Sequence, residues 1–396
     1  MVKAALAIAV KSDYLWEPHP VVLDQKIRKT MRRLLLLLLF ASVTIGACKK
    51  GPVFGTNNPT FNLDKFEQNI INAYTGHCVG FAYCINQNGQ LVRSGAHGLA
   101  RTAADGGEVP MTIDTRITIA SITKFITALG VARAVYDRAN TDFFDKIGPF
   151  LPSSFQPTAK FADITLEELL IHRSGIKKAP GDGIGDQSFD NLKQLAASFN
   201  SSDKTYAYCN KNFSLFRLIL PNLLPGVPWT PGLSEEEAYA QVYKTYIDDY
   251  VLSKAGIQSP SVVWRPGYAS LYPYPYNNEH GGGRQDWTLY CGAGGYYLSA
   301  KELAALMAYT WFSDEIASKD ERDNIFHKTN LYGLSESRNG DHGLYLIKGG
   351  GLGYGNHAFV AHYPNGVQLA IVNTGNDFSA GEAISMIQTL FDDAWE

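Results

Sequence analysis

Basic runs and metal-binding motifs are both missing from this sequence. Its 35 Lys and Arg nearly balance 38 Asp and Glu, for a formal net charge of -3, and no long run of Lys or Arg occurs in the body of the chain. A nucleic-acid surface is therefore excluded. The 9 histidines show neither His-Glu-x-x-His nor another clustered spacing, so we expect no bound metal.

Two further functional signatures are absent. Residues 349–355 are rich in glycine but form neither Gly-x-x-x-x-Gly-Lys nor Gly-x-Gly-x-x-Gly, so a phosphate-binding loop is not supported and no cofactor is expected. His280-Gly281-Gly282-Gly283 imitates the oxyanion motif of α/β-hydrolases, yet the chain has no Gly-x-Ser-x-Gly elbow. We interpret residues 280–283 as a flexible loop.

Long apolar runs are scarce, and the one near the N-terminus is short. Leu34 to Phe40 follows Met31-Arg32-Arg33 and precedes small residues. This run is too short to span a bilayer comfortably, and its basic start and small-residue exit are typical of an export signal. We predict a signal peptide over 31–47. Residues 1–30 precede it, so translation is expected to begin at Met31, unless the signal has an unusually long basic region.

The end of this signal resembles the lipobox of bacterial lipoproteins. The residues concerned are Ile45-Gly46-Ala47-Cys48. This resemblance implies that Cys48 is lipidated and becomes the first residue of the mature chain, with a tether over 48–60. We therefore expect a protein of the bacterial cell envelope that is anchored to a membrane at Cys48 and faces the periplasm or the exterior.

Cysteine is rare, with 5 in 396 residues. An exported protein can form disulfides. Cys78 and Cys84 are predicted to share one strand, where six residues span about 20 Å, beyond the reach of a disulfide. Cys209 and Cys291 are the only pair to consider, and the alternative is two buried free thiols.

Apolar alternation at both ends of the chain predicts one antiparallel sheet. Helix-like spacing over 61–74 precedes a hairpin with its turn in 86–89, and 380–394 form an amphipathic helix. Strands are expected over 78–85, 91–92, 331–336, 342–348, 358–363 and 367–372, with turns at Asn339-Gly340 and Pro364-Asn365-Gly366. Strands at both termini with helices outside them favour an α+β domain over 61–396, closed by the two chain ends. A mainly helical lobe is inserted at about 117–311.

Ser121-Ile122-Thr123-Lys124 opens an amphipathic helix and is the main candidate for catalysis. A lysine three residues beyond a serine lies on the same helix face, where it can take the proton of the hydroxyl. Free N–H groups at the helix start can stabilise an oxyanion. Ser174–Lys177 and Ser201–Lys204 have the same spacing, but their surroundings predict loops. The alternative is that Ser121 only caps a helix.

Two further elements follow in order, Tyr208-Cys209-Asn210 and Lys348-Gly349-Gly350. With Ser121 and Lys124, they resemble the serine β-lactamase and penicillin-binding-protein family, in its class C-like branch with related esterases and D-amino-acid peptidases. Ile164–Ile176 is similar to the family's Leu-Leu-x-His-x-Ser-Gly segment, and 292–295 to its small-residue turn. The other Tyr-x-Asn matches, at Tyr276 and Tyr363, lie in an aromatic loop and on a closing strand.

The resemblance implies a role for each of these residues. Lys124 and Tyr208 would deprotonate Ser121, and Tyr208 would return the proton to the leaving group. Asn210 would bind Lys124 and the substrate. Lys124 and Lys348 are the candidates for the positive charge that a tyrosine base requires. The N–H groups of Ser121 and Gly351 would form the oxyanion hole. Without chemistry, Tyr208 would be a core tyrosine and Lys348 a charge at a strand edge.

Gly349 departs from the family pattern, because lactamases and carboxypeptidases commonly carry a hydroxyl there that contacts the substrate carboxylate. We assign Gly349 and Gly350 to substrate binding, and the missing hydroxyl favours esters, or peptides held by other groups. We expect an exported serine hydrolase that forms an acyl-enzyme at Ser121 with a small-molecule or peptide substrate. The alternative is a penicillin-binding or cell-wall sensor protein of the same fold that does not turn over.

Aromatic residues gather between 264 and 297. They are Trp264, Tyr268, Tyr272, Tyr274, Tyr276, Trp287, Tyr290, Tyr296 and Tyr297. They either wall an apolar substrate pocket or form a small core under a long loop. A dependence of hydrolysis on ester chain length would distinguish these two roles.

Overall fold

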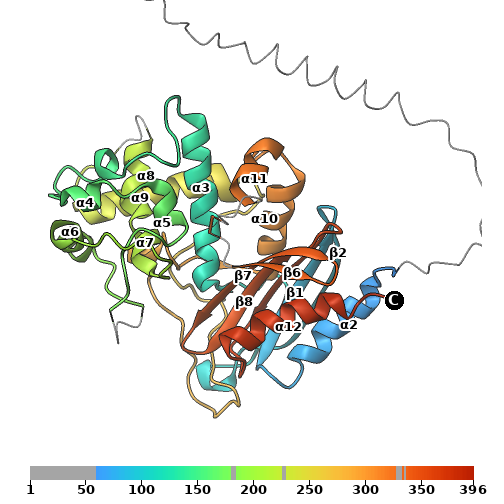
Figure 1. Cartoon of the computed structure of the whole chain (residues 1–396). Helices are drawn as coiled ribbons and strands as arrows, with labels where there is room; N and C mark the ends of the chain where they lie inside the picture. The colour runs from blue at the N-terminus through green and yellow to red at the C-terminus, as the bar shows by residue number, and fades with distance from the viewer. Residues whose placement is uncertain (1–58, 180–183, 225–228, 327–331, 334–335) are drawn as a thin grey trace, which may run out of the picture. The chain divides into compact units, whose positions relative to one another are not determined.

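The computed structural model describes residues 59–179, 184–224, 229–326, 332–333 and 336–396. A seven-stranded antiparallel sheet forms its centre, in the order β3-β2-β1-β9-β8-β7-β6 (Figure 1). The strands are β1 (Gly80–Gln87), β2 (Gln90–Arg101), β3 (Val109–Pro110), β6 (Glu336–Gly340), β7 (Gly343–Leu352), β8 (Gly355–His362) and β9 (Val367–Asn373). A separate pair consists of β4 (Ile117–Thr118) and β5 (Tyr297–Leu298). The α+β class predicted from the sequence is confirmed.

The helices begin largely where capping side chains occur in the sequence. Ser299 and Glu302 form a reciprocal capping box at one helix start, and Ser379 and Glu382 form another. The helices are α2 (Leu63–Tyr74), α3 (Thr123–Asp137), α4 (Ala159–Ala162), α5 (Leu166–Leu170), α6 (Phe189–Ser198), α7 (Asn210–Ser214), α8 (Phe216–Leu223), α9 (Glu235–Ile247), α10 (Ala300–Phe312), α11 (Lys319–Phe326) and α12 (Ala380–Asp392).

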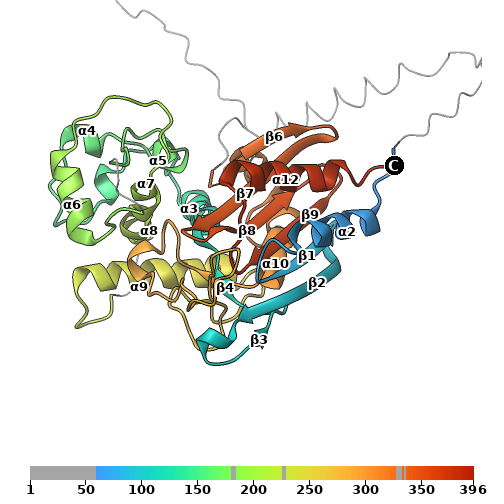
Figure 2. The same cartoon turned by 90° about the horizontal axis from the view of Figure 1, so that it is seen from below.

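The two ends of the domain meet in the middle of the sheet. β1 pairs with β9 from Phe81 opposite Asn373 to Gln87 opposite Val367. α2 and α12 lie side by side on one face of the sheet, as Figures 1 and 2 show. The strand pairing and the two terminal helices close the domain as the sequence predicted.

Both faces of the sheet are buried, and successive residues of β9 pack on opposite sides. Leu369 and Ile371 pack with α2 and α12, whereas Ala370 and Val372 belong to the core on the other face. A strand with period-two side-chain directions and two covered faces is apolar throughout. This explains why residues 367–372 are apolar on both faces of the strand, with the single exception of Gln368, which is also buried.

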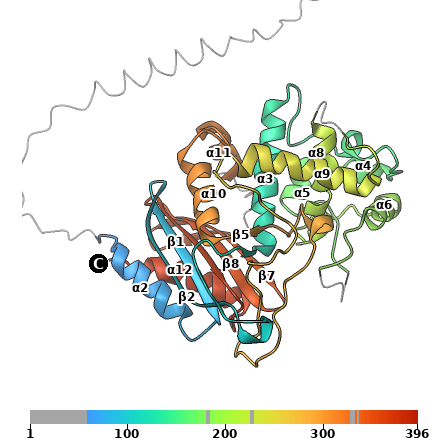
Figure 3. The same cartoon turned by 180° about the vertical axis from the view of Figure 1, so that it is seen from behind.

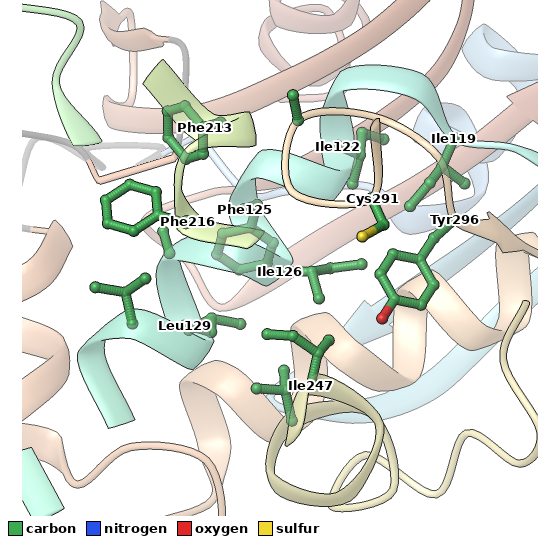
Figure 4. Packing of buried hydrophobic residues seen from close by; sticks show 14 of the residues in the cluster. Ile119, Ile122, Phe125, Ile126, Leu129, Phe213, Phe216, Ile247, Cys291 and Tyr296 are labelled. Atoms are coloured by element: carbon green, nitrogen blue, oxygen red, sulfur yellow. The ribbon is translucent and has the colours of Figure 1, made fainter. Parts of the chain in front are cut away.

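α10 lies on the face of the sheet opposite α2 and α12, and α3 lies beside α10 in the views of Figures 1 and 3. Figure 4 shows the core around α3, where Phe125 and Ile126 pack with Phe213, Phe216 and further apolar residues of the helical lobe. α10 packs on β1 and β9. The sequence predicted a helical lobe that extends to about 311 and so includes most of α10. Because α10 packs on the sheet, it belongs to the layer that covers this face of the sheet.

One of the predicted hairpin turns is confirmed and another is wrong. Asn88 and Gly89 have φ of 51° and 79°, as a two-residue hairpin requires. The turn predicted at Asn339-Gly340 is wrong, because Gly340 ends β6 and pairs with Gly343. The strand predicted over 331–336 is also displaced: 332–333 form a turn, and 331 and 334–335 lie outside the described residues.

Candidate active site

Ser121 lies in a 3₁₀ turn, Ala120–Ile122, that leads directly into α3. Ile122 and Phe125 are fully buried and hold this turn against the core. Ala120 has a φ of 43°, in the left-handed region that non-glycine residues rarely adopt. The strained turn places the half-buried Ser121 hydroxyl at a pocket, and backbone strain of this kind is common at functional sites.

Lys124 follows one turn later, and its side chain is fully buried. Its Nζ lies 3.1 Å from Ser121 Oγ, 2.9 Å from Asn210 Oδ1 and 2.6 Å from the carbonyl oxygen of Ala293. Burial lowers the pKa of Lys124 from 10.5 to about 7. A neutral amine can donate to the two oxygens of Asn210 and Ala293 and keep its lone pair for the Ser121 proton.

Tyr208 lies on the other side of the serine. Its hydroxyl is 2.8 Å from Ser121 Oγ. The Nζ atoms of Lys124 and Lys348 lie 5.1 and 6.0 Å from the centre of its ring. The structure thus brings together the three elements that are far apart in the sequence, and it places both predicted lysines beside the predicted tyrosine.

Asn210 begins α7 and has a fixed amide orientation. Its Oδ1 accepts from Lys124, and its Nδ2 donates to the carbonyl oxygen of Ile184 at 3.2 Å. One N–H of the amide is left for a substrate. The second contact was not foreseen, because a backbone carbonyl has no sequence signature.

Strand β7 supplies the opposite wall. Lys348 is buried, and Gly351 lines the pocket beside Ser121. A Cβ at Gly350 would lie 2.2 Å from the carbonyl oxygen of Ile119 and 3.3 Å from Ser121 N. Only glycine lets the strand approach the serine turn this closely. The next residue, Gly351, thereby lines the pocket together with Ser121.

Gly349 and Gly350 were assigned to substrate binding, but neither lines the pocket. A Cβ at Gly349 would lie 3.0 Å from the ring of Phe359, which belongs to the core under α2 and α12. Gly350 faces the serine turn, and the backbone of that turn occupies the space that a side chain at 350 would need. The geometry therefore gives these two glycines a packing role, since alternate strand residues point to opposite faces.

The pocket has aromatic and cationic walls. Trp287 and Tyr290 line it, which is the first of the two roles considered for the aromatic residues, whereas Tyr272, Tyr296 and Tyr297 are fully buried. Lys178 and Lys211 are its further charged lining residues, and no Asp or Glu occurs among the described residues that line it. The pocket thus combines apolar walls with positive charge.

The remaining sequence predictions are resolved as follows. Ser174 and Ser201 lie in loops, as expected. Cys209 and Cys291 are buried free thiols, so the pairing considered for them does not occur. The small-residue turn at 292–295 was foreseen, but not its function: Gly292 passes close to Phe213 O, and the next carbonyl, of Ala293, accepts from Lys124.

The anchoring prediction at Cys48 lies outside the described residues. Within the ranges that the structure describes, no helix is long and apolar enough to cross a membrane. The same ranges contain no group of three or more His, Cys, Asp or Glu that could hold a metal ion.

Several solved structures share this fold. A β-lactamase/D-alanine carboxypeptidase from Yersinia pestis, complexed with citrate, is 18% identical, with a TM-score of 0.62 over 84% of this chain and 96% of that one. A class C β-lactamase from Rhodobacter sphaeroides is 17% identical, with a TM-score of 0.61 over 83% and 98% of the two chains. A D-stereospecific amidohydrolase from Streptomyces sp. gives the same four values.

These structural matches show a shared fold, and no curated protein matches the chain. The family follows from the sequence itself. The family model described as Beta-lactamase matches residues 63–384, which include every described residue of the candidate site. With this match, the chain belongs to the beta-lactamase family.

Proposed function

We propose that this protein is a serine hydrolase that forms an acyl-enzyme at Ser121. The observation that carries this proposal is the position of Ser121 Oγ between Tyr208 OH at 2.8 Å and Lys124 Nζ at 3.1 Å. Both distances allow proton transfer from the serine. Because the pKa of Lys124 is lowered to about 7, the amine is available as a base near neutral pH.

The reaction has two stages. Ser121 Oγ attacks the substrate carbonyl while its proton passes to Lys124 or Tyr208, and the N–H groups of Ser121 and Gly351 stabilise the oxyanion. The carbon–oxygen or carbon–nitrogen bond to the leaving group then breaks, and the proton taken from Ser121 reaches that group through Tyr208. Water attacks the acyl-enzyme in the second stage and releases the acid and the free serine.

The walls of the pocket support esters as the first substrate class to test. One N–H of Asn210 is already bonded to Ile184, so less of its amide is available to hold a peptide flank. Trp287, Tyr290 and Leu352 offer apolar contact to an acyl chain.

We also propose that the protein is exported and held at a membrane of the cell envelope through Cys48. The support is the sequence alone: a basic start, a short apolar run and Ile45-Gly46-Ala47-Cys48. A tether of about a dozen residues would precede the domain.

The hydrolase is tested with the chain from Lys49 and p-nitrophenyl butyrate, with Ser121→Ala as the matched variant. We expect hydrolysis by the parent and its loss in Ser121→Ala. A folded parent without activity on this ester or on a panel of alkyl esters, amides and β-lactams would contradict the proposal.

A further inference from the structure

His172 holds the backbone on both sides of Tyr208. It follows α5 and has a φ of 56°. Its carbonyl oxygen accepts from Ala207 N at 2.9 Å, and its ring Nδ1 accepts from Cys209 N at 3.4 Å. One residue thus binds the backbone N–H groups of the two residues on either side of the tyrosine.

The imidazole ring also supports the phenol. The centres of the His172 and Tyr208 rings are 4.5 Å apart, and their planes are inclined by 42°. The side chain of Tyr208 is 42% exposed. Such an exposed side chain needs support from its buried side to hold one orientation, and the His172 ring provides contact there.

The direction of the hydrogen bonds shows that Nδ1 carries no proton. Ile176 N donates to Ser174 Oγ, which leaves the Ser174 hydroxyl to donate to Asn212 Oδ1 at 2.5 Å. The amide of Asn212 is thereby oriented with Nδ2 toward His172 Nδ1, at 3.1 Å. Two donors, Asn212 Nδ2 and Cys209 N, face the same ring nitrogen, which must therefore be an acceptor.

Burial and nearby charge keep this imidazole neutral. Desolvation, followed by the charges of Lys124 and Lys348, lowers the pKa of His172 to about 2. A neutral His172 adds no positive charge of its own beside Lys124 and Lys348. It also keeps Nδ1 free of a proton, so that Nδ1 accepts the bond from Cys209 N near neutral pH.

We propose that His172 is a positioning residue that holds the Tyr208 hydroxyl in line with Ser121 Oγ by accepting hydrogen bonds at Nδ1. His172 does not line the pocket, so it acts through Tyr208. The inference rests on the proposed hydrolase function. It assigns a role in catalysis to the network from Ser174 through Asn212 to His172, which is otherwise a feature of loop packing.

Two substitutions of His172 distinguish the contribution of its aromatic ring from that of its hydrogen-bond acceptor Nδ1. His172→Phe keeps an aromatic ring against Tyr208 but removes Nδ1. His172→Asn removes the ring, places Oδ1 near the position of Nδ1, and suits the left-handed backbone, which asparagine tolerates better than most residues. If the acceptor positions Tyr208, His172→Asn should recover much of the activity that His172→Phe loses.

Two esters with one acyl group separate positioning of the proton donor from general damage. The phenolate of p-nitrophenyl butyrate leaves without a proton, whereas the alkoxide of ethyl butyrate requires one. A misplaced Tyr208 should therefore lower kcat for ethyl butyrate by about tenfold more than for p-nitrophenyl butyrate. KM should change little for either ester. In the background of Tyr208→Phe, His172→Phe should have no further selective effect.

His362→Phe is the matched control. His362 also stacks on an aromatic ring, that of Trp311 at 4.7 Å, and its Nδ1 lies 3.3 Å from Gln368 Nε2, but it does not line the pocket. It should affect the two esters equally. If His172→Phe does not fold, Asn212→Asp is used in its place. A carboxylate that faces His172 Nδ1 favours a proton on that nitrogen, which can then no longer accept the hydrogen bond from Cys209 N. The same selective loss on ethyl butyrate is expected.

The outcomes are distinct. The proposal is supported if His172→Phe loses activity selectively on ethyl butyrate, if His172→Asn keeps much of that activity, and if His172→Phe causes no further selective loss in the Tyr208→Phe background. Equal losses on the two esters, losses that persist in the Tyr208→Phe background, or activity like that of the parent in His172→Phe or Asn212→Asp would overturn it. Absence of Ser121-dependent hydrolysis in the parent would instead overturn the hydrolase function, and with it this inference.

Discussion

Lys124 Nζ lies 2.6 Å from the carbonyl oxygen of Ala293, so the catalytic candidate is held by the turn that precedes β5 as well as by Asn210. The turn has to carry a glycine at 292 to pass this close, because a Cβ there would lie 2.4 Å from Phe213 O. The lysine is thereby kept buried, and burial is the cause of its low pKa.

The first prediction concerns pH. Burial lowers the pKa of Lys124 to about 7, so its neutral form predominates above that value and its protonated form below it. We expect kcat/KM for p-nitrophenyl butyrate to rise as pH increases through about 7, because the base must be unprotonated. The measurement is the pH profile of Ser121-dependent hydrolysis. A rate that stays constant on both sides of neutrality would show that Lys124 is not the titrating base.

The second prediction concerns the close approach of β7. Gly350→Ala places a Cβ 2.2 Å from Ile119 O, so the strand must move away from the serine turn. We expect most of the hydrolysis to be lost and the free energy of unfolding to fall by about 1–3 kcal/mol. Gly353→Ala is the control, because a Cβ there has no atom within 4 Å. Thermal unfolding and ester hydrolysis are measured on both variants, and equal behaviour of the two would refute this account of Gly350.

The third prediction concerns charge in the pocket. Lys211 lines it, and no acidic residue does so among the described residues. We expect Lys211→Gln to lower kcat/KM for a p-nitrophenyl ester of succinic acid about fivefold relative to p-nitrophenyl butyrate, because a partly exposed charge pair contributes about 1 kcal/mol.

Lys177→Gln is the control for this experiment. Lys177 pairs with Asp203 at 2.5 Å and does not line the pocket. Its substitution should leave the ratio between the two esters unchanged. A ratio that Lys211→Gln does not alter, at low and at physiological salt, would argue against an anionic preference set by this residue.

The fourth prediction concerns the anchor. The residues before Cys48 predict lipidation of its thiol, and a thioether cannot form on serine. In bacteria that express the full chain, we expect the parent in the membrane fraction and labelled by palmitate, and Cys48→Ser unlabelled. Cys78→Ser is the control cysteine within the domain. Equal membrane association and labelling of parent and Cys48→Ser would exclude this anchor.

The sequence predicted the parts of the site that depend on local spacing. Ser121 and Lys124 meet because three residues of a helix return to the same face, and the order of Tyr208 and Lys348 along the chain identified their partners. Ala293 O and Ile184 O could not be predicted, since a backbone carbonyl carries no residue signature. Likewise, the contact of His172 with Tyr208 joins two loops through tertiary packing.

The fold was predictable for a related reason. Apolar runs such as 367–372 and helix caps such as Ser379 with Glu382 are local signals. The turn at Asn339-Gly340 failed because a shift of two residues leaves each side chain on the same face, so the apolar pattern does not distinguish the two registers. The placement of α10 was missed because a helix apolar enough to pack on a sheet resembles one packed in a helical lobe.

The most direct test of the central claim is the intact mass of the protein after mixing with p-nitrophenyl butyrate and rapid acid quench. We expect a population heavier by one butyryl group, located by peptide mapping on the segment that contains Ser121 and absent from Ser121→Ala. The adduct should form more slowly in Lys124→Met, which lacks the base that activates Ser121. Hydrolysis with the adduct on another residue, or hydrolysis that survives in Ser121→Ala, would contradict the account.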